Sequence, residues 1–153
     1  MSEEVPDQIE KSILIQAPVA RVWRALTNHV EFGQWFRVKL DLPFTPGGVS
    51  TGAMTYPGCE GLEWKAVIER IEPETLFTFR WQPDSHLVGK DAEEVWTLVT
   101  FYLEPASGGS RLTVTESGFS KLPPNRRFNS FRDNSEGWEI QTGNIAQYVL
   151  DNP

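Results

Sequence analysis

The sequence has little cysteine and no long apolar run. Its one cysteine, Cys59, has no partner for an internal disulfide, so a reducing, cytoplasmic compartment fits this composition best. A membrane-spanning helix needs about eighteen or more apolar residues in succession, and the chain contains no such run. The acidic start, MSEEVPDQIE, also lacks the apolar stretch of a signal peptide. These absences predict a cytoplasmic protein with no membrane span.

Positive charge is scarce as well. Lysine and arginine together number 14, against 21 aspartate and glutamate residues, which gives a formal net charge of -7. A field of this sign repels the phosphate backbone of nucleic acids and the surface of acidic membranes. Nucleic acid is therefore not an expected partner.

The common catalytic and metal-binding motifs are absent from the sequence. His29 and His86 lie in predicted helix-turn and loop segments, and no CxxC, HExxH, GxSxG or phosphate-binding glycine motif occurs. Cys59 lies in a predicted loop with no basic neighbour, so we expect an exposed thiol without a chemical role. We therefore expect no metal, no cofactor and no catalytic residues.

Aromatic residues, in contrast, are plentiful. The chain of 153 residues has six Trp, nine Phe and three Tyr. Each contributes roughly 2 to 3 kcal/mol when it is buried, which allows a sizeable core without disulfides or metal. We expect residues 1–8 to form a flexible tail and residues 9–152 to form a single domain.

Hydrophobic periodicity divides the domain into a helical start, a run of strands and a helical end. Residues 9–15 alternate as a strand, residues 18–27 have helical spacing behind Pro18, and residues 29–36 offer short helical turns. Six segments rich in Val, Thr, Phe and Trp follow, separated by turn signals, and indicate consecutive antiparallel strands. These segments are 38–44, 49–56, 62–72, 75–82, 93–104 and 110–119.

The chain after Pro123 returns to helical spacing for about 26 residues. One face of this helix is apolar apart from two hydroxyls, and it needs a concave partner that only the sheet can supply. The pattern predicts an α+β helix-grip fold, in which a curved antiparallel sheet of about six to seven strands surrounds a long C-terminal helix, with two short helices near the N-terminus. The residues of the face are Phe128, Phe131, Ser135, Trp138, Thr142, Ile145 and Val149.

Four stretches of local sequence resemble one known family. They are APVARVWRALTNHVEFGQWF, VIERIEPETLFTFRW, SRLTVTESGF and NSEGWEIQTGNIAQYV, which together extend over nearly the whole chain. The chain resembles the SRPBCC (START-like, birch-pollen-allergen-like) superfamily and, within it, the family named for an activator of the heat-shock protein 90 ATPase. The resemblance implies a START-like fold with a cavity between sheet and helix. Because this scaffold hosts lipid carriers, aromatase/cyclases and co-chaperone domains, fold alone does not decide the function.

Glu116 is the most informative candidate for the site. Leu112, Val114 and Glu116 share one face of their strand, so the carboxylate faces the interior if the two aliphatic side chains do. In a cavity it would resist ionisation and could act as a polar anchor or as a general acid or base. The alternative is a carboxylate near the strand end that pairs with Arg111, Arg80 or a helix residue.

The other candidates are aromatic or carry a hydroxyl group. The stripe that contains Phe79 and Trp81 forms either core or cavity wall, as do Trp64 and Thr97. Hydroxyls on the long helix either contact a ligand or bond to the carbonyl one turn earlier. The resemblance places Trp35 and Phe36 at the cavity mouth. The expected ligand-binding residues are Trp35, Phe36, Trp64, Phe79, Trp81, Thr97, Glu116, Phe131, Ser135, Trp138 and Thr142.

Three functions remain open at this point. The first is a binding domain for an apolar or amphipathic small molecule, without a catalytic role. The second is an enzyme of the aromatase/cyclase type, in which Glu116 and Arg80 move protons. The third is a co-chaperone-like contact with heat-shock protein 90, which ranks lower because such proteins typically combine two domains and this chain has room for one.

Overall fold

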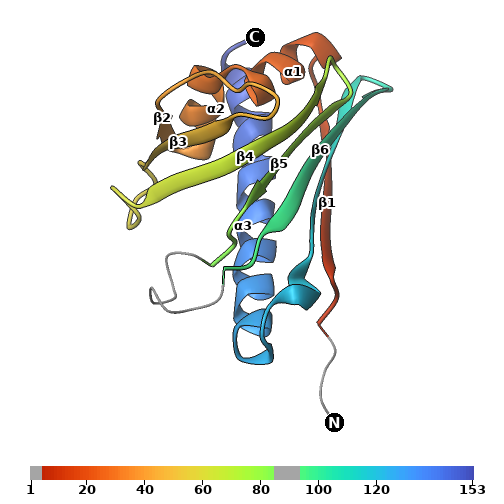
Figure 1. The fold of residues 1–153 in the computed structure, drawn as a ribbon. Helices are drawn as coiled ribbons and strands as arrows, with labels where there is room; N and C mark the ends of the chain where they lie inside the picture. Colours follow the sequence, from red (N-terminus) through yellow and green to blue (C-terminus); the bar gives the residue numbers. More distant parts are fainter. Residues whose placement is uncertain (1–4, 85–93) are drawn as a thin grey trace.

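A long helix lies in the grip of a curved antiparallel sheet (Figure 1), which confirms the predicted helix-grip fold class. The computed structural model describes residues 5–84 and 94–153, and the sheet has seven strands within those ranges. In chain order the elements are β1 Gln8–Ile15, α1 Val19–Thr27, α2 His29–Phe36, β2 Val38–Leu40, β3 Val49–Met54, β4 Glu63–Glu72, β5 Leu76–Trp81, β6 Thr97–Ala106, β7 Gly109–Ser117, η1 Phe119–Lys121 and α3 Pro124–Asp151.

The sheet is a meander with one added edge strand. Its order is β1-β7-β6-β5-β4-β3-β2, so that consecutive strands from β2 to β7 are neighbours and β1 pairs with β7. A shift in the pairing register between Ile68 and Arg70 marks an irregularity in β4. An extra residue of this kind bends a strand and increases its twist, which helps the sheet to curve. The concave face therefore turns toward α3.

The two short helices lie beside one end of α3 (Figure 1). The side chain of Asn28 caps α2, because its Oδ1 accepts from the backbone nitrogens of Val30 and Glu31, each at 3.1 Å. A side chain at Gly33 would place its Cβ 2.3 Å from the carbonyl oxygen of Val38. Glycine at this position therefore allows α2 to approach the start of β2 closely.

The buried face of α3 differs from the predicted one in its first half. Phe128 is 52% exposed, whereas Ser130 is 2% exposed. Phe119 and Leu122, which precede the helix, already fill the core at this end, being 0% and 1% exposed. In the second half the prediction is confirmed, since the helix buries Trp138, Thr142, Ile145 and Val149. None of the helices in the described ranges is long and apolar enough to cross a bilayer.

The residues before β1 hold the far end of β7. The Asp7 carboxylate accepts from the backbone nitrogens of Gly118 and Ser120, at 3.2 and 3.0 Å. Hydrogen bonds from Ser120 lower the pKa of Asp7. Within the expected tail of residues 1–8, Gln8 belongs to β1 and residues 1–4 lie outside the described residues.

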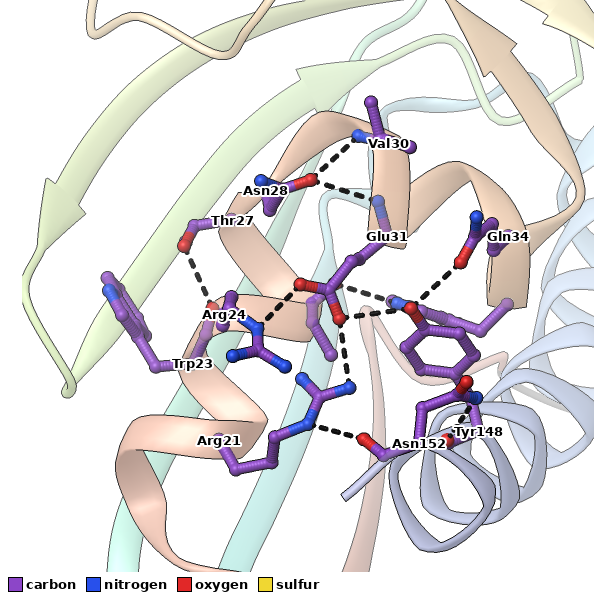
Figure 2. Close-up of polar contacts among 12 residues, drawn as sticks. Arg21, Trp23, Arg24, Thr27, Asn28, Val30, Glu31, Gln34, Tyr148 and Asn152 are labelled. Carbon is purple, nitrogen blue, oxygen red and sulfur yellow. Dashed lines mark hydrogen bonds and ion pairs between the residues drawn. The ribbon is translucent and has the colours of Figure 1, made fainter.

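A polar network joins α1 and α2 to the C-terminal end of α3 (Figure 2). Glu31 accepts from Arg24 Nε at 2.7 Å and from Tyr148 Oη at 3.0 Å, and its Oε1 lies 2.9 Å from Arg21 Nη2. Arg21 Nε also donates to the carbonyl oxygen of Asn152, at 2.7 Å. Burial alone would raise the pKa of Glu31, but the hydrogen bond from Tyr148 and the two arginine charges lower it from its ordinary value.

This network makes the stability of the fold depend on pH. Because the pKa of Glu31 is lower in the folded chain, its ionised form stabilises the fold above its ordinary value of 4.5, and this contribution is lost as the pH falls through the lowered pKa. At neutral pH, Glu31→Gln should reduce the free energy of unfolding by about 1 to 3 kcal/mol, as measured by urea denaturation. The difference from the unmodified protein should shrink in acid. An equal loss in the exposed control Glu10→Gln would contradict this role.

Candidate functional site

Four side chains from three elements converge on the carboxylate of Glu116, which is 0% exposed. Its Oε1 accepts from Trp138 Nε1 at 2.9 Å, and its Oε2 accepts from Trp81 Nε1 at 2.8 Å and from Thr97 Oγ1 at 2.6 Å. Asn134 Nδ2 lies 3.0 Å from Oε1 and 3.1 Å from Oε2. The donors come from β5, β6 and α3, so Glu116 on β7 links both layers of the fold.

Strand alternation directs Glu116 inward together with Leu112 and Val114, all at most 1% exposed. The sequence left open a pairing with Arg111, Arg80 or a helix residue, and of these it is residues of α3, Asn134 and Trp138, that contact the carboxylate. Arg111 and Arg80 are exposed, Arg111 Nη1 donates to Ser12 Oγ at 3.3 Å, and Arg80 Nε lies 2.6 Å from an oxygen of Glu69. Both arginines are an odd number of positions from the inward residues of their strands, so they project from the opposite face.

Hydrogen-bonding side chains surround both oxygens of the Glu116 carboxyl. Burial raises the pKa of this carboxyl above its ordinary value, while the four hydrogen-bonding side chains act in the opposite direction. The two indole nitrogens can only donate, and one of them contacts each oxygen. Among the described residues, those that contact the carboxylate carry no positive charge. Neutral groups therefore hold this carboxyl, and its pKa is raised because it is buried without a counter-ion in contact with it.

A cavity of about 660 Å³ lies beside this cluster, between α3 and the neighbouring ends of β3, β4 and β5. Four aromatic side chains, Phe36, Trp64, Trp81 and Trp138, line it and are called the aromatic wall below. Neighbouring rings of the wall lie with centroids 5.3 to 6.2 Å apart. Other lining residues are Met54, Tyr56, Cys59, Leu62, Trp96 and Ile140.

The three indole N–H groups of the aromatic wall all donate to acceptors on the side away from the cavity. Glu116 accepts from the indole nitrogens of Trp81 and Trp138, and Ser50 Oγ accepts from that of Trp64 at 3.0 Å. Each of these three indoles is thus fixed in orientation by a buried acceptor. These three residues consequently present apolar ring surface to the cavity, and their N–H groups need no partner there.

Thr97 and Glu116 are not among the lining residues and lie behind the aromatic wall. Phe79 is 0% exposed and packs in the core, with its ring centroid 5.6 Å from that of Trp64. Trp35 is also buried, and its indole nitrogen donates to the carbonyl oxygen of Ala25 at 2.8 Å. Of the sheet and short-helix candidates, Phe36, Trp64 and Trp81 are therefore the ones that border the cavity.

The candidates on α3 separate in the same way. Trp138 lines the cavity, whereas Phe131 packs on Phe119 with ring centroids 5.3 Å apart. Thr142 Oγ1 donates to the carbonyl oxygen of Glu139 at 3.2 Å, which is the bond within the helix that the sequence left as an alternative. Ser135 is half-buried and is not among the lining residues. Trp138 is thus the one candidate on this helix that reaches the cavity.

Several lining residues were not predicted. Asn134, Gly137 and Gln141 border the cavity from α3, and Gln141 Nε2 donates to the carbonyl oxygen of Phe36 at 3.0 Å. Asn134 lies four residues before Trp138, so its helical spacing was a usable signal. Cys59 is half-buried at the cavity, which corrects the expectation of an exposed loop thiol. The connection from β3 to β4 that carries it reaches the cavity only through the tertiary fold.

A family model described as "Activator of Hsp90 ATPase homolog 1-like protein" matches residues 16–150. The structure of MLL2253 from Mesorhizobium loti is similar, with a TM-score of 0.78, 20% identity and coverage of 95% of this chain and 98% of that one. NE0264 from Nitrosomonas europaea has a TM-score of 0.73 and 19% identity, over 95% and 96% of the two chains. At these identities the likeness establishes a shared fold.

DynU16, a protein of the dynemicin biosynthetic locus, is also similar, with a TM-score of 0.72 and 22% identity. The match covers 95% of this chain and 48% of DynU16, so this chain corresponds to about half of that protein. This likeness, too, concerns the fold. No curated protein sequence matches the chain.

The arrangement around Glu116 predicts that an amide cannot replace the carboxylate. In Glu116→Gln the side chain keeps one acceptor oxygen, so one of the two indole N–H groups would face an NH₂ group and stay unpaired. We expect a loss of about 1 to 3 kcal/mol in the free energy of unfolding, measured by urea denaturation, with altered near-UV dichroism of the tryptophans. Thr97→Val, which removes one donor, should cost less. Its control is Thr100→Val on the opposite face of β6, and equal effects of Thr97→Val and Thr100→Val would contradict the prediction.

Proposed function

This chain belongs to the Activator of Hsp90 ATPase homolog 1-like family, and we propose that it is a binding domain for an apolar or amphipathic small molecule. The ligand would lie in the cavity between α3 and the sheet. The observation that carries the proposal is the cavity of about 660 Å³ with its aromatic wall. Ligand sites typically have volumes of roughly 300 to 1,000 Å³ and are mostly apolar, with a few polar groups that orient the ligand.

The aromatic wall is organised before any ligand arrives. Because Glu116 and Ser50 already accept from its three indole nitrogens, these N–H groups need not lose a hydrogen bond to water when an apolar ligand binds. Preorganisation of this kind lowers the entropic cost of binding. Asn134 and Gln141 supply polar groups at the edge of the cavity, which suits an amphipathic ligand.

The two alternative functions receive less support from the described residues. A cyclase of the kind considered above needs Glu116 to reach its substrate, but this carboxylate is engaged by four side chains and does not line the cavity. Arg80, its suggested partner, pairs with Glu69 on the outer face of the sheet. The co-chaperone hypothesis rests on the family name, and no contact surface in the structure adds to it.

Filling the cavity should abolish ligand binding without harming the fold. A Cβ at Gly137 or at Gly143 would meet no atom within 4 Å, and of these two helical glycines Gly137 lines the cavity. We expect Gly137→Phe to weaken the binding of the neutral probe N-phenyl-1-naphthylamine at least about tenfold, since it removes apolar contact area. Probe fluorescence measures the affinity.

Gly143→Phe is the matched control, because it makes the same change on an exposed side of α3. Both variants should keep the unfolding midpoint or raise it slightly, since glycine within a helix costs about 0.5 to 1 kcal/mol. Unchanged affinity in Gly137→Phe would place the probe elsewhere. Absence of probe binding to the unmodified protein, together with no small molecule retained in native mass spectrometry, would refute the binding function.

A further inference from the structure

The buried carboxylate of Glu116 has no positive partner in contact with it among the described residues. Its hydrogen bonds come from two indoles, a hydroxyl and an amide, all of them neutral. Charges in protein interiors are usually paired, because the energy of an isolated charge is high where the surroundings are poorly polarisable. In its ionised form, the Glu116 carboxylate would extend a negative potential through these hydrogen-bond donors toward the cavity.

Trp81 and Trp138 are the two residues of the aromatic wall that contact Glu116 directly. Both donate their N–H to Glu116, at 2.8 and 2.9 Å, and both line the cavity, with ring centroids 5.7 Å apart. A hydrogen bond to an anion polarises the donor, and an indole that donates in this way gains electron density on its ring. Since cations are attracted to the electron-rich face of an aromatic ring, and most strongly to tryptophan, these two rings favour a cation.

The rim of the cavity carries the same sign of charge. Asp133 and Glu136 on α3 are exposed lining residues, and Asp133 also lies 3.2 Å from Arg132. Among the described residues, Lys65 is the one basic residue that lines the cavity, but it follows the inward Trp64 in β4 and is exposed. Alternation along the strand therefore directs its ammonium group away from the side of the sheet that Trp64 faces. The net charge of -7 adds to this potential.

We infer that the cavity takes an organic cation, an ammonium group attached to an apolar body, with the positive charge over the ring faces of Trp81 and Trp138. This inference rests on the proposed binding function and specifies the chemical class of the ligand. The apolar body would contact the remaining rings of the aromatic wall, and the acidic rim would attract the cation to the mouth. An anion of the same shape would meet repulsion at both places.

Three probes of one shape test the charge preference. They are benzyltrimethylammonium, phenylmethanesulfonate and the neutral hydrocarbon neopentylbenzene, titrated into ¹⁵N-labelled protein while the indole N–H resonances are followed. We expect the ammonium ion to bind at least about tenfold more tightly than the sulfonate. If the hydrocarbon binds and the sulfonate equals or exceeds the ammonium ion, this inference is wrong and the binding function stands. If none of the three binds, the binding function itself fails.

Two variants locate the origin of the preference. Glu116→Gln removes the buried carboxylate, and the comparison is made only if this variant still binds neopentylbenzene; the ratio of ammonium to sulfonate affinity should then fall about tenfold. A ratio that stays unchanged in this variant would overturn the inference. Should Glu116→Gln no longer bind the hydrocarbon, the rim variant Glu136→Gln decides instead.

Glu136→Gln should lower the same ratio about two- to threefold at low salt, and less at high salt. Its control is Glu139→Gln, which removes the same charge from the same helix at a position outside the cavity, where Glu139 lies 3.4 Å from Lys11. If Glu136→Gln and Glu139→Gln lower the ratio equally, the effect comes from the net charge of the protein. That result would contradict a site for cations.

Discussion

The buried carboxylate of Glu116 is the interaction on which the rest of the site depends. Burying a carboxylate requires donors for both of its oxygens, and these come from β5, β6 and α3. The requirement sets the rotation of α3 about its axis, because Asn134 and Trp138 must face β7. It also sets the orientation of Trp81. One group thereby joins the two layers of the fold and arranges the wall of the cavity.

Two further carboxylates hold α3 toward its ends. Asp84, which is 3% exposed, accepts from Arg126 at 2.7 and 2.9 Å in a two-pronged contact near the start of the helix. Near the end of the helix, Glu31 accepts a hydrogen bond from Tyr148 Oη at 3.0 Å. The cavity lies beside the middle one of these three contacts, where Trp138 both lines it and donates to Glu116.

The aromatic wall combines rigidity with chemical selectivity. Its indole nitrogens are satisfied from behind, so that the rings present their faces and not their polar edges to the cavity. The same hydrogen bonds place the carboxyl of Glu116 behind the rings of Trp81 and Trp138. A single arrangement thus accounts both for the apolar surface that a small molecule would contact and for the preference in ligand charge that we infer.

The order and type of the elements could be determined from the sequence, because strand alternation and helical spacing are local patterns. Those patterns also gave the inward direction of Glu116 and the burial of Trp138. Only the tertiary structure decided which side chains reach the cavity. Ser130 replaces Phe128 in the buried face because Phe119 and Leu122 fill that end of the core, and the rotation of α3 follows from its hydrogen bonds to Glu116 on β7. Such contacts join residues distant in the chain, so no local pattern records them.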